Sequence, residues 1–181
     1  MTKTITIITG SVRPNNVGEA LLPHVQTLLA AKDVHVQVAN LRELELPFFN
    51  GPVSPVDESY EITDEHAKVW QELIAKSDGV VFLTPEYNHA MSAVQKNAVD
   101  WLFQEWKDVP AATISYGWGG GALAAEALEK LLKKVEAAPL ATATNLFFMK
   151  DITPSGEVID ESAVNGKLDA TLEEVVTSVA A

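Results

Sequence analysis

A polar loop near the N-terminus has the residue types of an anion-binding site. Residues 10–18 are Gly-Ser-Val-Arg-Pro-Asn-Asn-Val-Gly, between a β-branched segment and an amphipathic one. Its hydroxyl, amides, guanidinium and backbone N–H groups could together hold a phosphate at a helix N-terminus. An ordinary strand-to-helix turn has a similar composition, so the loop alone leaves both interpretations open. It is not a Walker A loop, because the spacing G-x-x-x-x-G-K-[ST] and its lysine are missing.

Two later loops also combine polar residues with proline or glycine. Thr-Pro-Glu-Tyr-Asn-His-Ala-Met occupies positions 84–91, and Ser-Tyr-Gly-Trp-Gly-Gly-Gly occupies positions 115–121. The histidines of the chain lack the spacing of a metal site, and only His89 belongs to one of these loops. We predict no metal site, and we expect the other histidines to be surface residues: His24, His35 and His66.

The segments that must position these loops alternate between strand-like and helix-like patterns. Apolar or β-branched runs predict strands at 5–9, 34–38, 79–84, 111–115 and 141–148. Apolar residues at helical spacing predict helices at 21–29, 67–74, 92–102, 123–135 and 164–179. The order of these segments therefore predicts that each strand is followed by a helix.

Three local features bear on where the helices begin. Thr63 is a candidate N-cap for the second helix, and Ser92 with Gln95 has the pattern of a capping box. Pro23 falls where the first helix should already be running, and an interior proline costs about 3 kcal/mol. That helix therefore either begins near Leu21, which would move its dipole away from the candidate phosphate loop, or is kinked.

Five strands, each followed by a helix, predict an α/β domain built on a mostly parallel sheet. Apolar and polar residues alternate in 34–38, as in an edge strand, whereas 79–84 is continuously apolar, as in a central strand. This pattern predicts a flavodoxin-like doubly wound fold with strand order 2-1-3-4-5, helices on both faces and one domain over residues 1–181. Segment 5–9 is richer in threonine than a central strand usually is. Ligands of such sheets bind beyond the carboxyl ends of the strands, where the three polar loops should meet.

The composition excludes several classes of function. The chain has 181 residues and a formal net charge of -12, with 47% hydrophobic and 21% charged residues, which is an ordinary globular mix. Its scattered Lys and Arg argue against binding of nucleic acid or of an anionic membrane surface. Cysteine is absent, which excludes disulfides, thiolate metal sites and cysteine nucleophiles. With no apolar run near the ~18 residues of a membrane span and no signal-peptide core, we expect a cytoplasmic protein.

The second polar loop carries a resemblance to a known family. Thr84-Pro85-Glu86-Tyr87-Asn88, followed by Lys96-Asn97-Ala98-Val99-Asp100-Trp101, resembles the signature of the NADPH-dependent FMN reductase family within the flavodoxin-like superfamily. Three further features match: Gly10-Ser11-x-Arg13, Leu46-Pro47-Phe48-Phe49, and Ser115-Tyr116-Gly117 with the glycines after it. These features span most of the chain in the order of the family, which also contains quinone, azo-dye and chromate reductases.

The resemblance implies a cofactor, FMN, and a co-substrate, NADPH or NADH. It implies phosphate contacts from Ser11, Arg13 and Asn16, with Val17 beside them. It implies that the isoalloxazine ring is held by Pro85, Glu86, Tyr87, Asn88 and His89. It implies that the far end of the site is formed by Ser115, Gly117, Trp118, Gly119 and Gly120, where Trp118 could instead meet a partner subunit.

Hydride transfer to a flavin needs a fixed cofactor and backbone dipoles rather than a side-chain acid. We therefore name no catalytic side chain, and we expect Glu86 to position the loop rather than to act as a base. The chain departs from the family pattern at Asn16, where many members have serine, at Ala90 and Ser92, and in a glycine loop about one residue shorter. Residues 117–122 also match the dinucleotide fingerprint, but the acidic residue expected about 20 positions later is missing.

The sequence thus predicts an NAD(P)H oxidoreductase that passes two electrons through bound FMN to quinones, azo compounds, free flavin or metal oxyanions. Two alternatives are a flavodoxin-type single-electron carrier, whose acidity would suit basic partners, and a non-catalytic flavin-binding module. The resemblance also implies a homodimer or homotetramer, with the loop 46–55 and its Phe48 and Phe49 as candidate contacts. Apart from Arg13 the loops offer little positive charge for an NADPH 2'-phosphate, so the nucleotide preference stays open.

Overall fold

Strand β1 (Thr4–Thr9) is an interior strand of the sheet, and its three isoleucines are fully buried. The computed structural model describes residues 2–180. The threonines of β1 tolerate burial because their hydroxyls find partners. Thr6 Oγ1 pairs with Ser77 Oγ at 2.5 Å and accepts from Gln37 Nε2 at 2.9 Å, while Thr9 Oγ1 donates to Asn40 at 3.3 Å. The threonine content of this segment is therefore compatible with a central position.

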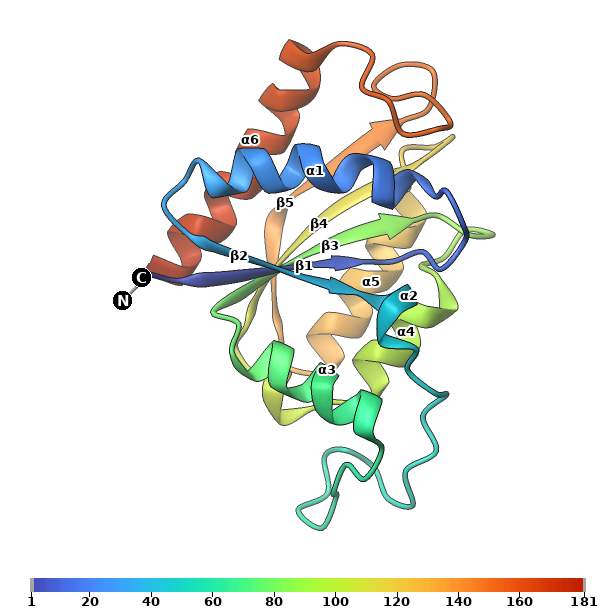
Figure 1. Cartoon of the computed structure of the whole chain (residues 1–181), viewed down its shortest axis with the longest axis vertical. Helices are drawn as coiled ribbons and strands as arrows, with labels where there is room; N and C mark the ends of the chain where they lie inside the picture. The colour runs from blue at the N-terminus through green and yellow to red at the C-terminus, as the bar shows by residue number, and fades with distance from the viewer. Residues whose placement is uncertain (1, 181) are drawn as a thin grey trace.

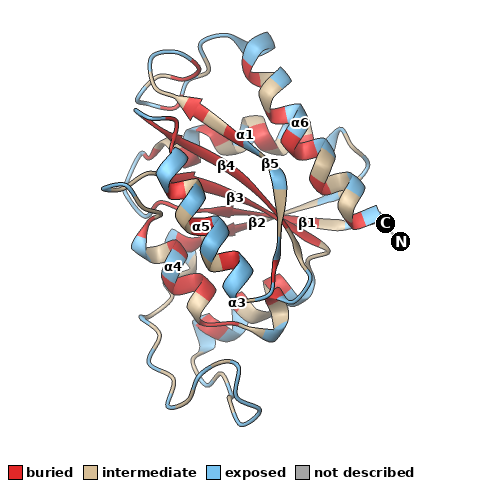
Figure 2. Cartoon of the chain, turned by 180° about the vertical axis from the view of Figure 1, so that it is seen from behind, coloured by how far each residue is buried: buried red, intermediate tan, exposed pale blue. Residues whose placement is uncertain are grey.

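All five strands are parallel and lie in the order β2-β1-β3-β4-β5, which confirms the predicted flavodoxin-like topology. The other strands are β2 (His35–Asn40), β3 (Gly79–Pro85), β4 (Pro110–Gly117) and β5 (Ala138–Phe147). Every residue of β3 is buried, whereas β2 and β5 at the two edges are largely half-exposed (Figure 2). The apolar run thus lies in the middle of the sheet, as its pattern predicted.

Helices cover both faces of the sheet (Figure 1). One face carries α1 (Val17–Ala30) and α6 (Glu161–Ala180), and its core contains Leu21, Val25, Leu168 and Leu172. The other face carries α3 (Glu65–Ala75), α4 (Ala93–Asp100) and α5 (Ala122–Lys134), around Trp70, Trp106 and Leu128. Two short helices, α2 (Leu41–Leu44) and the 3-10 turn η1 (Gln104–Trp106), complete the order. No helix within residues 2–180 is long and apolar enough to cross a membrane.

The first helix begins at Val17, so the late start near Leu21 is wrong. Asn16 caps the helix by accepting a hydrogen bond from the Glu19 amide at 3.0 Å, and Pro23 lies inside it. The cap and the buried face of Leu21, Val25 and Leu29 offset the hydrogen bond that Pro23 cannot donate. The positive end of the α1 dipole therefore stays beside the polar loop.

Two other helix starts differ from the sequence-based expectation. Asp64, not Thr63, caps α3, with its carboxylate accepting from the Ala67 amide at 2.9 Å. Only half of the capping box at α4 forms. Ser92 accepts from the Gln95 amide at 3.3 Å, but the Gln95 side chain donates to Leu83 and Thr84 instead of returning to Ser92. Gln95 is buried against Gly10, so its side-chain amide donates to the nearby Leu83 and Thr84 rather than to Ser92.

The long segment between α2 and α3 runs beyond the sheet without regular structure (Figure 1). Asn97 of α4 fixes its start, accepting from the Phe49 amide at 2.8 Å and donating to the Pro47 carbonyl at 2.9 Å. Phe49 packs edge-on against Trp101 with ring centroids 5.3 Å apart. Asn97 and Trp101 therefore act as anchors of this segment, while Phe48 is 77% exposed.

Candidate functional site

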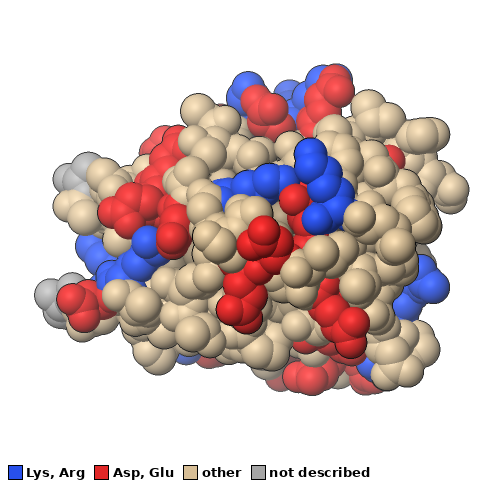
Figure 3. All heavy atoms as spheres, turned by 90° about the horizontal axis from the view of Figure 1, so that it is seen from above, with Lys and Arg blue, Asp and Glu red and all other residues tan. Residues whose placement is uncertain are grey.

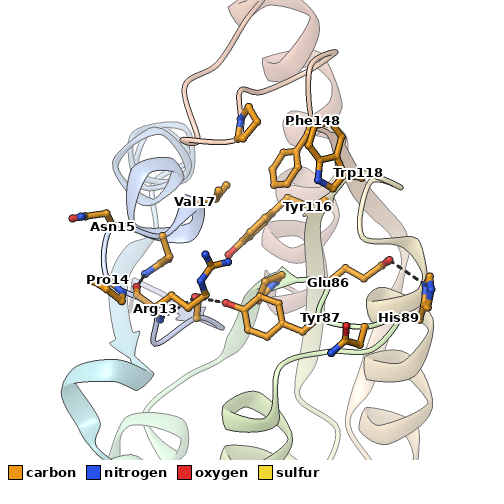
Figure 4. Close-up of a pocket in the computed structure, with 16 residues that line it drawn as sticks. Arg13, Pro14, Asn15, Val17, Glu86, Tyr87, His89, Tyr116, Trp118 and Phe148 are labelled. Atoms are coloured by element: carbon orange, nitrogen blue, oxygen red, sulfur yellow. Dashed lines mark hydrogen bonds and ion pairs between the residues drawn. The ribbon is translucent and has the colours of Figure 1, made fainter.

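The loops after β1, β3 and β4 meet at one rim of the sheet and enclose a cavity of about 610 Å³ (Figures 1 and 4). This volume lies in the range of small-molecule and cofactor sites. Most of the residues predicted for the site line this cavity: Ser11, Arg13, Asn16, Val17, Pro85, Glu86, Tyr87, Asn88, His89, Gly117 and Trp118. Ser115, Gly119 and Gly120 are not among its lining residues, and Tyr116, Phe148 and Pro154 are lining residues that the sequence did not single out.

The first loop presents a positive end to the cavity. Arg13 is exposed, and no carboxylate within the described residues lies at salt-bridge distance from it. The Asn16 side chain is already engaged, because it caps α1 and also donates to the Arg13 carbonyl at 2.8 Å. The loop thus offers a guanidinium and a helix N-terminus to an anion, whereas Asn16 mainly shapes the loop.

Ser11 and Tyr87 join the first two loops. Their hydroxyl oxygens are 2.7 Å apart, and Ser11 Oγ also accepts from the Arg13 amide at 3.3 Å. Tyr87 opens a tight turn with reciprocal backbone bonds to Ala90, and both central residues, Asn88 and His89, have positive φ. This is the geometry of a two-residue hairpin turn of type I'. The turn fixes Tyr87, and the bond from Tyr87 fixes Ser11 where it lines the cavity.

Glu86 joins the second loop to the third. Its amide donates to the Tyr116 carbonyl at 3.2 Å, and its carboxylate accepts from the Leu123 amide at 3.1 Å. The N-cap residue of α5, Gly121, has no side chain that could cap the helix, so Glu86 supplies the missing acceptor from another loop. His89 Nδ1 lies 3.6 Å from the same carboxylate. Glu86 is thus held by the fold, as a positioning residue would be.

Ser115 and Tyr116 illustrate the alternation of a strand. Successive side chains point to opposite sides, so the two cannot both face the cavity. Ser115 Oγ donates to the Gly120 carbonyl at 2.8 Å and accepts from Asn145 at 2.7 Å, which holds the glycine loop in place. Tyr116 lines the cavity, and its hydroxyl is buried with no hydrogen-bond partner among the described residues.

The environment of Tyr116 keeps its proton on the phenol. Burial is the main cause that raises its pKa far above the ordinary value for tyrosine, and the neighbouring Tyr87 adds to the effect. A Cβ atom added at Gly18 would lie 2.9 Å from the hydroxyl oxygen, so the phenol reaches the first turn of α1. The motif Ser115-Tyr116-Gly117 contains Tyr116 but does not mark it as a site residue. Because neighbouring residues of a strand point to opposite sides, the alternation in β4 could have indicated that Tyr116 and Ser115 do not both face the cavity.

The glycine loop owes its shape to backbone conformation. Gly120 and Gly121 both have φ near +70°, and a Cβ at Gly120 would lie 2.7 Å from the ring of Phe147. These glycines are required by the turn and by its close packing against β5. Gly117 is the glycine whose backbone borders the cavity.

Aromatic side chains form the wall opposite the first loop (Figure 4). Trp118 is 73% exposed and packs edge-on against Phe148, with ring centroids 5.5 Å apart. Phe148 comes from the segment after β5, which also contributes Pro154. The cavity thus combines an anion-binding end with an apolar wall, as the phosphate and the flat ring of FMN require. Within residues 2–180 no group of three or more His, Asp or Glu side chains is arranged to hold a metal ion.

Comparison with known proteins assigns the family. The model of the NADPH-dependent FMN reductase family matches residues 3–148. An NAD(P)H-dependent FMN reductase from Nectria sp is 36% identical over 157 residues, covering 79% of this chain and 78% of the relative. An NADPH:quinone oxidoreductase from Arabidopsis thaliana is 30% identical over 126 residues, covering 65% and 59% of the two chains.

A solved structure is similar in fold over the whole length. The flavoenzyme FerB from Paracoccus denitrificans, an NAD(P)H:(acceptor) oxidoreductase, matches with a TM-score of 0.76 and 26% identity, covering 98% of this chain and 99% of that chain. The family model, the similar relatives and this structure agree with the resemblance carried by the loop motifs. The chain belongs to the NADPH-dependent FMN reductase family.

Proposed function

We propose that this protein is an FMN-dependent NAD(P)H oxidoreductase that transfers two electrons from a reduced nicotinamide to a small acceptor of the quinone type. One observation carries the proposal. In a chain of this family, an exposed guanidinium, a helix N-terminus and an aromatic wall converge on one cavity at the rim of a flavodoxin-like sheet. The comparisons lend no support to a single-electron carrier or to a non-catalytic module.

In this proposal the first loop holds the phosphate. Arg13 supplies charge and paired N–H donors, the first turn of α1 supplies backbone N–H groups, and Ser11 supplies a hydroxyl oriented by Tyr87. Asn16 contributes through the cap that places the helix end. Val17 lines the same end of the cavity.

The second and third loops hold the ring. Bound FMN supplies a flavin that can accept a hydride from NAD(P)H and return two electrons to an acceptor. Pro85 and the turn 87–90 line one side of the cavity, while Gly117 lets the backbone approach on the other. Glu86 keeps these two loops together through its bonds to Tyr116 and Leu123. These residues bind and orient, so no side-chain base is needed for the electron transfer.

The wall of Trp118 and Phe148 favours flat aromatic acceptors. An exposed indole beside the cavity can cover a quinone or azo compound by offset stacking. The similar NADPH:quinone oxidoreductase supports quinones as the first class to test. Free flavin and metal oxyanions remain further members of the proposed acceptor range.

We also propose a single domain that assembles as a homodimer or homotetramer and works in the cytoplasm. The absence of cysteine fits a reducing compartment, and Phe48, 77% exposed in the loop 46–55, is a candidate contact between subunits. Light scattering should give a mass of at least twice the 19.6 kDa of one chain. A value of about one chain at micromolar concentration would contradict the assembly.

The activity can be tested directly. The purified protein should retain FMN after desalting, with flavin absorption bands, and should oxidise NADPH or NADH when a benzoquinone is added. Omission of the quinone and omission of FMN are the two controls. Retention of FMN without nicotinamide oxidation by any quinone or azo acceptor would contradict the enzymatic function while leaving the binding site intact.

A further inference from the structure

Two buried side-chain polar atoms lack a hydrogen-bond partner within the described residues, and one of them belongs to a residue that lines the cavity. One is Gln95 Oε1, beneath the loops, and the other is the hydroxyl of Tyr116. Tyr116 is 3% exposed, yet it lines the cavity, and its hydroxyl lies beside the Gly18 backbone with no acceptor for its proton among the described residues. Such an atom is destabilising unless a ligand completes its hydrogen bonding.

The direction of the phenol narrows the choice of ligand. In Figure 4 the ring of Tyr116 extends from β4 toward Arg13 and Val17, away from Trp118. Its oxygen reaches the first turn of α1, because a Cβ added at Gly18 would lie 2.9 Å from it. The hydroxyl therefore points to the end of the cavity where the helix dipole and the guanidinium favour an anion. The aromatic wall lies at the other end.

The protonation state makes Tyr116 a donor. Burial, together with the charge interaction with Tyr87, raises the pKa of the phenol above its ordinary value, so the proton stays on the oxygen at neutral pH. Tyr87 differs in this respect, because its hydroxyl is already paired with Ser11 at 2.7 Å. Tyr116 thus offers an unused O–H at the anion-binding end, independently of the residues predicted from the loop motif.

We propose that the Tyr116 hydroxyl donates a hydrogen bond to the phosphate group of bound FMN at the N-terminus of α1, and thereby selects FMN over riboflavin. This inference rests on the proposed function and adds a ligand from β4 to a phosphate site otherwise built from the loop after β1. It also explains the absence of a side chain at Gly18. A methyl group there would collide with the phenol and with Asn16, 3.1 Å away.

The first test uses stability of the protein without flavin. Tyr116→Phe removes an unpaired buried hydroxyl, so its melting temperature should equal or exceed that of the wild type. The matched control is Tyr60→Phe, because Tyr60 donates to the Trp101 carbonyl at 3.0 Å, away from the cavity, and its loss should lower the melting temperature. A clear drop for Tyr116→Phe would mean that the hydroxyl has a partner in the protein itself, and would overturn the inference.

The second test compares two flavins in equilibrium titrations followed by flavin fluorescence. Tyr116→Phe should raise the Kd for FMN by about tenfold or more, the loss expected for a hydrogen bond to a charged group, and should change the Kd for riboflavin by less than about twofold. Gly18→Ala, which displaces the phenol, should follow the same pattern. Tyr60→Phe should leave the ratio of the two Kd values unchanged.

Inorganic phosphate provides a readout without flavin. Millimolar phosphate should raise the melting temperature of the flavin-free wild type, and should raise that of Tyr116→Phe less. Equal weakening of FMN and riboflavin, or no change in either, would overturn the role of Tyr116 even if the wild type binds FMN. A wild type that binds neither flavin would instead refute the proposed function, which keeps the two failures distinguishable.

Discussion

At Arg13 the cavity presents a guanidinium that no described carboxylate neutralises at salt-bridge distance. In the proposed site it faces a phosphate, and a fork of N–H donors suits that geometry better than a point charge does. Arg13→Gln should therefore raise the Kd for FMN by about 10- to 100-fold, with a much smaller effect on riboflavin. Arg13→Lys should be intermediate. Equal affinities of the Gln variant and the wild type in a fluorescence titration would show that Arg13 faces something other than the phosphate.

Glu86 lines the cavity, but the contacts of its carboxylate are structural. It caps α5 through the Leu123 amide, so a glutamine, whose carbonyl oxygen can accept the same bond, should replace it well. Turnover of NAD(P)H in Glu86→Gln should fall by less than about tenfold, because loss of a general base costs ~10²- to 10⁴-fold. Glu86→Ala should lower the free energy of unfolding by about 1 kcal/mol, as loss of a helix cap does.

The pH dependence of the rate distinguishes the two roles of Glu86. Steady-state rates of Glu86→Gln should follow the same pH profile as those of the wild type. Chemical denaturation should show a lower free energy of unfolding for Glu86→Ala than for Glu86→Gln. A hundredfold loss of turnover together with a lost limb in the pH profile would make Glu86 a base.

Single residues also mark the limit of sequence-based prediction. Most of the residues that the loop motifs named line the cavity, because motif residues follow strand ends; their contact with a cofactor stays a prediction. The motif named Ser115 as a site residue, whereas Tyr116 is the one of the two that lines the cavity, since a motif does not say which of two adjacent strand residues faces it. Phe148 was missed because the segment after β5 has no motif, and only the packing against Trp118 brings it to the cavity.

At the scale of elements, the turn after β3 carries strain that can be measured. His89 has φ 65°, a conformation that costs a side-chain-bearing residue more than glycine, and its side chain is 80% exposed. His89→Gly should therefore raise the free energy of unfolding by about 0.5–1 kcal/mol. Asn88→Gly is the matched comparison and should gain less, because asparagine tolerates this conformation better. Destabilisation by His89→Gly in urea denaturation would mean that the contact with Glu86 outweighs the backbone strain.

The segment after β5 is held by Asp151. Burial alone would raise the pKa of this carboxyl, but hydrogen bonds from Lys167 Nζ at 2.5 Å and from the Phe147 amide at 2.9 Å outweigh it, so the pKa lies below its ordinary value. A lowered folded-state pKa stabilises the protein fully above the unfolded pKa of about 4. That contribution is lost as the pH falls through the folded-state pKa.

Asp151→Asn should lower the free energy of unfolding at pH 7 by about 1–3 kcal/mol and remove part of the acid sensitivity below about pH 4. Urea denaturation at several pH values measures both effects. Glu43→Gln, an exposed change on α2, is the control and should leave both nearly unchanged. An equal loss of stability in the two variants would remove Asp151 as the anchor of this segment.

Helix boundaries were harder to predict than the helices themselves. Pro23 suggested a late start for α1, but the cap at Asn16 and the buried face of the helix outweigh one missing hydrogen bond. The hydrogen bond from Gln95 back to Ser92 does not form at α4, because Gln95 is buried under Gly10 and donates to the Leu83 carbonyl instead. In both cases tertiary packing overrides a local rule, which the sequence of one segment does not reveal.

At the scale of the whole molecule, the strand order could be predicted because the residue patterns of β2 and β3 indicate how buried each strand is. Alternation in β2 and continuous apolar character in β3 favour the order 2-1-3-4-5 over an order with β3 at the edge, and the parallel sheet then brings the loops after β1, β3 and β4 to one rim. On the face seen from above in Figure 3, acidic and basic side chains are interspersed, with no extended surface of one sign.

The central claim is that three loops at one rim of the sheet jointly bind FMN, and a crystal structure of the protein grown with FMN tests it most directly. The account predicts density for the phosphate at the first turn of α1, within hydrogen-bond distance of Arg13, and for the ring between the turn 87–90 and Gly117. Flavin density elsewhere on the molecule, or an empty cavity at saturating FMN, would contradict it.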